Sequence, residues 1–156
     1  MKIYVATGLE HADRARVVQS VLRDDGHEIT YGWTVHGSVQ DAGPKRIAEV
    51  ARLEAAGVRA ADLLIAILPG GRGTHVEIGL ALGRGIPVIL LQHVDDAEKL
   101  PTCAFYSLAR RHYVWGTEEG LRYAARWAVL ALEGAYDDDD QGAEYGPPED
   151  YVEDEE

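Results

Sequence analysis

LLIAILPGGRGTHVEIGLALGRGIPVIL, residues 63–90, sets the architecture expected of the whole chain. It opens with six apolar residues, Leu63 to Leu68, and then breaks at the glycine-rich loop Pro69–Gly73. Helical spacing runs from Thr74 to Gly83, and a second apolar run covers Val88 to Leu91. This order predicts a strand, a glycine loop, a helix, a turn and a strand, which together make one βαβ unit.

Strands and helices also alternate before this unit. Ile3–Ala6 and Glu28–Tyr31 are short apolar runs, and a helix is expected between them at Asp13–Asp25. A second helix should begin at Pro44 and run to about Ala56, with an interruption at Gly57 and a last turn that reaches Ala61.

After the unit, residues 92–104 are expected to be mostly loop, and Tyr113–Trp115 is a candidate fifth strand. Thr117 is expected to cap a final helix that runs to about Glu133. The alternation predicts an α/β fold over residues 1–136: a flavodoxin- or Rossmann-like three-layer sandwich with a parallel sheet of about five strands.

Charge is spread unevenly along the chain, whose net charge is −12. From Asp137 onward there are eleven acidic residues and no Lys or Arg, so residues 137–156 are expected to form a disordered acidic tail. That tail either solvates the protein or docks on a basic partner. The other sixteen acidic residues nearly balance all fifteen basic ones, and the lack of a basic stripe argues against binding to duplex nucleic acid.

Composition also indicates the compartment. Cys103 is the sole cysteine, no signal peptide precedes the first strand, and no apolar run is long enough to span a membrane. These features favour a cytoplasmic protein with no membrane partner. The histidines and Cys103 lack the spacing of metal ligands, so no metal or other cofactor is expected.

Three loops should converge at the carboxyl edge of the sheet, where parallel sheets bind ligands. They are Thr7–Gly8, Gly32–Gly43 and Pro69–Thr74. Trp33, in the second loop, either stacks on a base or covers the edge of the sheet. In the third loop, glycines let backbone N–H groups approach a ligand closely.

Glu77 lies three residues beyond Thr74, and this spacing has two interpretations. In one, Thr74 and Glu77 form a capping box at the start of the helix. In the other, the helix N-terminus keeps Glu77 ionised as a nucleophile that attacks an electrophilic sugar carbon.

The heptapeptide Gly73–Gly79, GTHVEIG, resembles the signature of nucleoside 2-deoxyribosyltransferases and of the related 2'-deoxynucleoside 5'-phosphate N-hydrolases. The resemblance implies that Glu77 attacks C1' of the sugar and that Tyr4, in the first strand, orients it. Gly8 matches the turn glycine after that strand, and Glu54 matches the acid that handles the base. It also implies a homodimer or a higher homo-oligomer.

The chain departs from that family at several positions. Glu54 is one methylene longer than the usual Asp, and Gly71 stands where transferases carry Asp and hydrolases Ser. Glu10 occupies the position of an Arg with which the hydrolases grip a phosphate. The transferases complete their site with an Asn from a neighbouring subunit, and this chain has no Asn.

A second resemblance competes with the first. Residues 69–77, PGGRGTHVE, also fit the P-G-G-x-G-T-x-x-E motif of the lysine-decarboxylase-like phosphoribohydrolases. Arg72 is then a candidate phosphate ligand, and His75 a candidate contact to the base or sugar. Both families cleave N-glycosidic bonds, so the expected substrate is a nucleoside or a nucleotide. A non-catalytic nucleotide-sensing module, in which Glu77 only caps its helix, is the alternative from another class.

Overall fold

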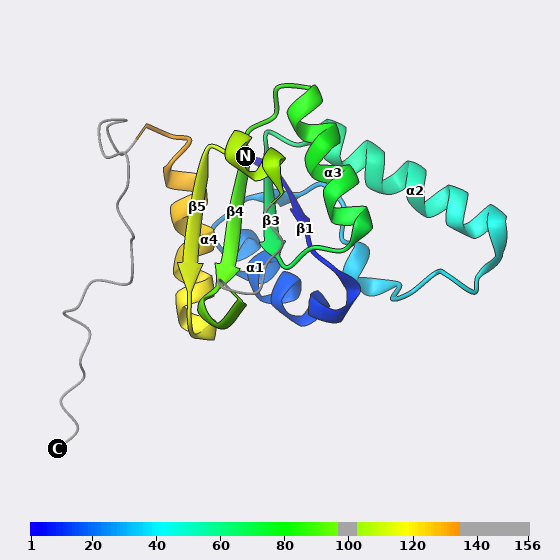
Figure 1. Cartoon of the computed structure of the whole chain (residues 1–156), viewed down its shortest axis with the longest axis horizontal. Helices are drawn as coiled ribbons and strands as arrows, with labels where there is room; N and C mark the ends of the chain where they lie inside the picture. The colour runs from blue at the N-terminus through cyan, green and yellow to red at the C-terminus, as the bar shows by residue number, and fades with distance from the viewer. Residues whose placement is uncertain (97–102, 135–156) are drawn as a thin grey trace, which may run out of the picture.

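The computed structural model describes residues 1–96 and 103–134, which fold around one five-stranded sheet (Figure 1). The strands are β1 (Lys2–Ala6), β2 (Glu28–Ile29), β3 (Leu63–Leu68), β4 (Val88–His93) and β5 (Arg111–Trp115). They lie in the order β2-β1-β3-β4-β5, and every neighbouring pair is parallel. This confirms the predicted α/β fold, and the strand order is that of flavodoxin-like sheets.

Four helices cover the two faces of the sheet. They are α1 (Ala12–Asp24), α2 (Gly43–Ala60), α3 (Arg72–Gly83) and α4 (Glu118–Leu130). Helices α1 and α4 pack together on one face, and α2 and α3 pack together on the other (Figure 1). A bidentate pair between Asp25 and Arg126, at 2.7 and 3.1 Å, ties the end of α1 to α4.

The central strands form the core. All six residues of β3 and the last four of β1 are buried, because helices cover both faces of the sheet. Each fully buried Leu or Ile side chain contributes about 1.5–3 kcal/mol relative to an exposed one. The strands that carry the site loops at their carboxyl ends are therefore a rigid platform.

The glycine loop departs from prediction at one point that matters for the site. Helix α3 begins at Arg72, two residues earlier than expected, with Gly71 as the N-cap residue. Thr74 is the third helical residue; its side chain is buried beneath Gly70, where an added Cβ would be 2.6 Å from Thr74 Cγ2. The capping-box interpretation is therefore wrong, because Thr74 lies inside the helix and not at its cap.

Helix α2 also differs from prediction, since it runs without interruption through Gly57 to Ala60. Other ends differ by a few residues: β2 is shorter, β4 continues to His93, β5 begins at Arg111, and α4 ends at Leu130. Thr117 caps α4 as predicted, accepting a hydrogen bond from the Gly120 amide. The 3₁₀ helix Val94–Asp96 lies within the predicted loop 92–104. A second 3₁₀ helix, Ala104–Leu108, begins at the last residue of that loop. The predicted tail, 137–156, lies outside the described residues.

Candidate active site

Tyr4 and Glu77 form the centre of the candidate site. The alternation of β1 turns the fully buried Tyr4 toward the face covered by α2 and α3. Its hydroxyl donates a hydrogen bond of 2.5 Å to Oε1 of Glu77, which is in the second turn of α3. Strand β1 and helix α3 thus bring together two residues that are 73 positions apart.

Burial controls the protonation of this pair. Loss of solvent raises the pKa of Glu77 to about 7, although the hydrogen bond from Tyr4 favours the ionised form and lowers it. The negative charge of Glu54 raises it further. Burial and the Glu77 charge raise the pKa of Tyr4 far above its usual range, so Tyr4 stays a hydrogen-bond donor. Near neutral pH, Glu77 is therefore only partly ionised, and the ionised form is the one that can act as a nucleophile.

Glu54 reaches the same site from α2. Burial raises the pKa of this half-buried carboxyl, and His36 partly offsets that effect. His36 lies in the loop after β2; its Nδ1 is 3.0 Å from the Gly37 carbonyl, and its buried Nε2 has no partner among the described residues. Because a carbonyl only accepts, Nδ1 carries the proton of the neutral ring.

Two residues near Glu54 were not assigned a role from the sequence. They are His36 and Tyr31, whose rings are 6.0 Å apart; His36 lowers the pKa of Glu54, and Glu54 raises the pKa of Tyr31. The available signal was the length and composition of the loop 32–43 at the carboxyl edge of the sheet. A loop residue has no periodicity, so the sequence could not show which of its side chains turns toward Glu54.

The loops after β1 and β3 meet as expected. A Cβ added to Gly71 would be 3.8 Å from Gly8 Cα, so the two glycines lie side by side. The Glu10 carboxylate folds over Gly8, where an added Cβ would be 2.6 Å from Glu10 Cδ. The junction of the two loops therefore has a negative group beside it. Arg72 and Gly73, the first two residues of α3, are exposed.

His75 supports the glycine loop from the side. Its Nδ1 is 2.8 Å from the Gly71 carbonyl, and its Nε2 is 2.8 Å from the hydroxyl of Tyr106. Nδ1 must donate to the carbonyl, so Nε2 accepts from Tyr106. The two rings also stack, with centroids 5.6 Å apart. In this arrangement both ring nitrogens of His75 are engaged by the protein.

We expect Tyr106→Phe to lower the free energy of unfolding by about 1 kcal/mol, because it leaves the His75 Nε2 acceptor without its donor. The measurement is urea denaturation. Tyr123→Phe is the matched control, since Tyr123 is 41% exposed on α4. Equal stability of the two variants would contradict the assigned hydrogen bond.

Trp33 and Thr74 take buried positions in the structure. Trp33 is 5% exposed, and its indole N–H donates to the Val5 carbonyl at 2.7 Å. This geometry supports the interpretation in which Trp33 covers the edge of the sheet. The Thr74 hydroxyl is buried without a hydrogen-bond partner among the described residues.

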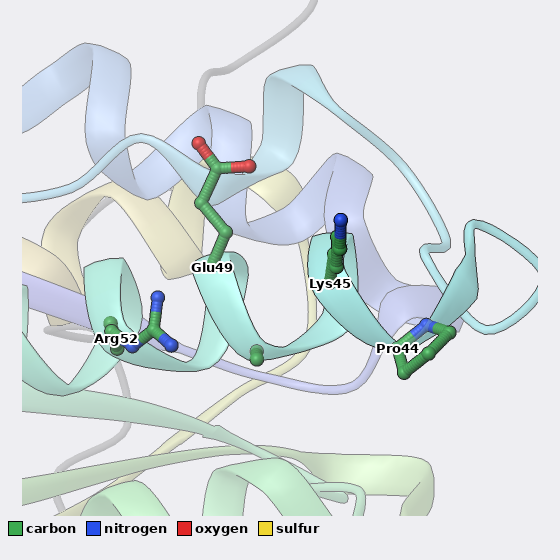
Figure 2. Close-up of a pocket in the computed structure, with 5 residues that line it drawn as sticks. Pro44, Lys45, Glu49 and Arg52 are labelled. Atoms are coloured by element: carbon green, nitrogen blue, oxygen red, sulfur yellow. The ribbon is translucent and has the colours of Figure 1, made fainter.

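One surface pocket is lined by none of these residues. It has a volume of about 640 Å³ and is lined by Pro44, Lys45, Ala48, Glu49 and Arg52, all from α2 (Figure 2). A pocket lined by one helix is an open surface feature, so the geometry around Glu77 is the better guide to the chemistry. In residues 1–96 and 103–134, no group of His, Cys, Asp and Glu is arranged to hold a metal ion.

A family model described as nucleoside 2-deoxyribosyltransferase matches residues 3–139. No curated protein matches the sequence significantly. None of the helices in the described part of the chain is long and apolar enough to cross a membrane.

Solved structures with a similar fold include two proteins that are named for an enzymatic activity. A CMP N-glycosidase, BcmB, from Clostridium botulinum is 19% identical, with a TM-score of 0.56; the match covers 81% of this chain and 98% of that one. A 2-deoxyribosyltransferase from Bacillus psychrosaccharolyticus is 20% identical, with a TM-score of 0.56 and coverage of 78% and 90%. A conserved protein from Enterococcus faecalis V583 is 23% identical, with a TM-score of 0.54 and coverage of 81% and 98%.

Proposed function

The chain belongs to the nucleoside 2-deoxyribosyltransferase family, and from this membership we propose that it cleaves the N-glycosidic bond of a nucleoside or nucleotide through a glycosyl-enzyme ester on Glu77. The observation that carries the proposal is the hydrogen bond between Tyr4 and Glu77. A partly buried carboxylate that is held by a tyrosine, on the helix that follows a glycine loop at the ligand edge of a parallel sheet, is suited to attack on C1' of a sugar.

In the first step an oxygen of ionised Glu77 forms a bond to C1', and the C1'–N bond breaks with its electron pair going to the base. The departing base needs a proton, which the carboxyl of Glu54 supplies. Glu54 fits this task, because burial raises its pKa and so favours the protonated form. Tyr4 keeps its proton and orients Glu77.

In the second step a nucleophile attacks C1' and releases Glu77 as a carboxylate. If the nucleophile is water, its proton passes to Glu54 or His36 and the products are a free sugar and a base. If it is a second base, the product is a new nucleoside. We propose that the reaction needs no cofactor and that the chain acts as a homo-oligomer.

Base release from a panel of nucleosides and their 5'-monophosphates, measured by chromatography with and without an acceptor base, tests this proposal. Base release without an acceptor indicates a hydrolase, and exchange that requires an acceptor indicates a transferase. A correctly folded protein that binds members of the panel but turns none over would favour a nucleotide-sensing module.

We expect unphosphorylated nucleosides to raise the melting temperature at least as much as their monophosphates do. The reason is the Glu10 carboxylate over Gly8, together with the absence of a side chain at Gly71. Thermal-shift titration is the measurement. Glu10→Arg should improve monophosphate binding, whereas Glu119→Arg makes the same change of charge on α4 and should not.

A preference for monophosphates would change the interpretation of the site. Strong stabilisation by monophosphates, with none by nucleosides, would contradict this expectation. It would favour the phosphoribohydrolase interpretation, with the exposed Arg72 at the start of α3 as the phosphate ligand.

A further inference from the structure

Gly57 lies where α2 packs tightly against Tyr4 of β1 and against Tyr31, which follows β2. It is buried in the last two turns of the helix. A Cβ added there would be 2.7 Å from Tyr31 Cβ, and 3.0 and 3.1 Å from Cε2 and Cδ2 of the Tyr4 ring. The first distance is shorter than Cβ contacts in folded proteins, and Tyr31 Cβ cannot swing away as the end of a long side chain can. The backbone of α2 therefore rests directly on Tyr4 and Tyr31.

This contact is next to the groups proposed for catalysis. The ring that touches Gly57 is the one whose hydroxyl holds Glu77. Glu54 is three residues before Gly57, so the two are neighbours on one side of α2. The position of α2 against Tyr4 thus fixes where Glu54 lies relative to Glu77.

Glycine is unfavourable in the interior of a helix, so its presence there calls for a packing reason. Gly79 and Gly83 of α3 have no atom within 4 Å of an added Cβ, and both are exposed. Gly57 differs from them because Tyr4 and Tyr31 occupy the space that a side chain at this position would need.

We propose that Gly57 is a positioning residue that sets the spacing between α2 and β1, so that the Tyr4 hydroxyl and the Glu54 carboxyl meet Glu77 at the same time. The proposal rests on the function proposed for Glu77. A methyl group at position 57 clashes first with Tyr31 Cβ, at 2.7 Å, and then with the Tyr4 ring. If α2 moves outward to clear Tyr31, it takes Glu54 with it. If the backbone at Tyr31 yields instead, the Tyr4 ring is still 3.0 Å from the new methyl group and must shift, which disturbs its bond to Glu77.

The test compares Gly57→Ala with Gly83→Ala, which adds the same methyl group to a helix in open space. We expect Gly57→Ala to lower kcat at least tenfold with a smaller change in KM, and Gly83→Ala to leave both unchanged. Normal turnover by a folded Gly57→Ala protein would overturn the proposal.

A second readout does not depend on turnover. The carboxyl of Glu77 is titrated by ¹³C NMR in the wild type and both variants; the titratable groups that act on it are Tyr4 from β1 and Glu54 from α2. Gly57→Ala should shift the midpoint, upward if the bond from Tyr4 is lost and downward if Glu54 has moved away, whereas Gly83→Ala should not. An unchanged midpoint would overturn the proposal. If the wild type cleaves no nucleoside, the proposed function fails, and this titration still tests Gly57.

A double-mutant cycle separates positioning from a general loss of stability. If Gly57 acts through Tyr4, Gly57→Ala should cost much less activity in a Tyr4→Phe background than in the wild type. Additive losses, together with a Glu77 midpoint equal to that of the wild type, would mean that Gly57 has only a structural role.

Should Gly57→Ala fail to fold, Tyr31→Gly supplies a second background. It removes the atom closest to the new methyl group and leaves the contact with the Tyr4 ring. In this background Gly57→Ala should fold and still shift the Glu77 midpoint relative to Tyr31→Gly alone. Folding without such a shift, or failure to fold in this background as well, would overturn the proposal.

Discussion

Glu77→Gln is expected to fold normally and to lose roughly three or more orders of magnitude in kcat. The amide keeps the shape of the side chain and an oxygen that can accept the hydrogen bond from Tyr4. The substitution removes the negatively charged oxygen that forms the bond to C1'. It also removes the negative charge that stabilises the developing positive charge on the sugar. Steady-state kinetics on whichever nucleoside the wild type cleaves is the measurement, with Glu119→Gln on α4 as the matched control.

The same variant should be more stable than the wild type in alkaline solution. The pKa of Glu77 is about 7 in the folded protein, against an ordinary value of 4.5. A raised carboxyl pKa stabilises the fold while the group is protonated, and this stability is lost as pH rises from 4.5 through 7. The difference amounts to about 3 kcal/mol. Since an amide does not ionise, urea denaturation should show an advantage of the variant at pH 8 that shrinks as pH falls and disappears below pH 4.5.

Covalent trapping provides an independent check on Glu77. A 2'-fluoro nucleoside analogue slows release of the sugar, so the intermediate should accumulate as an adduct on the peptide that contains Glu77. Mass spectrometry should find it in the wild type and not in Glu77→Gln. Near-normal turnover by Glu77→Gln would mean that another group is the nucleophile, and the proposed mechanism would be wrong.

Tyr4→Phe is expected to show the second-largest effect, and that effect should depend on pH. The hydroxyl bonds a charged carboxylate, a type of interaction that contributes about 1.5–3 kcal/mol, so kcat should fall roughly ten- to hundredfold. The bond lowers the pKa of Glu77, so its loss should move that pKa further above 7. The acidic limb of the pH–rate profile should therefore shift to higher pH, and the loss should be greater at pH 6 than at pH 9.

Tyr123→Phe, at an exposed site on α4, is the control for Tyr4→Phe and should leave the profile unchanged. A uniform loss for Tyr4→Phe at every pH would contradict the electrostatic part of the argument. It would mean that Tyr4 orients Glu77 without affecting its protonation.

The sheet could be predicted from the sequence because its strands are buried on both faces and appear as continuous apolar runs. Residues 63–68 are the clearest example, since all six are buried. The family match likewise confirms the resemblance seen in residues 73–79. Ends of elements were less predictable, because they depend on hydrogen bonds and not on periodicity.

The site was predicted less completely, for reasons that two residues illustrate. The spacing of Thr74 and Glu77 fits both a capping box and a catalytic helix, and only the start of α3 at Arg72 rules out the capping box. Gly57 was expected to interrupt its helix, because glycine has a low helix propensity. The sequence alone does not show which residues pack against it. The contact with Tyr4 and Tyr31 exists only after β1, β2 and α2 have assembled.

The division of the helices between two faces of the sheet has a consequence for how this protein can change. Tyr4, Glu54 and Glu77 all belong to the face covered by α2 and α3, whereas the Asp25–Arg126 pair joins α1 and α4 on the opposite face. Effects of substitutions more than about 7–10 Å apart, with no shared partners, usually add. The stability lost by keeping a charged carboxylate buried can therefore be regained by compensatory substitutions in α1 and α4, which leave the reacting groups in place. The proposed site constrains substitutions on one face of the sheet, and stabilising substitutions can accumulate on the other.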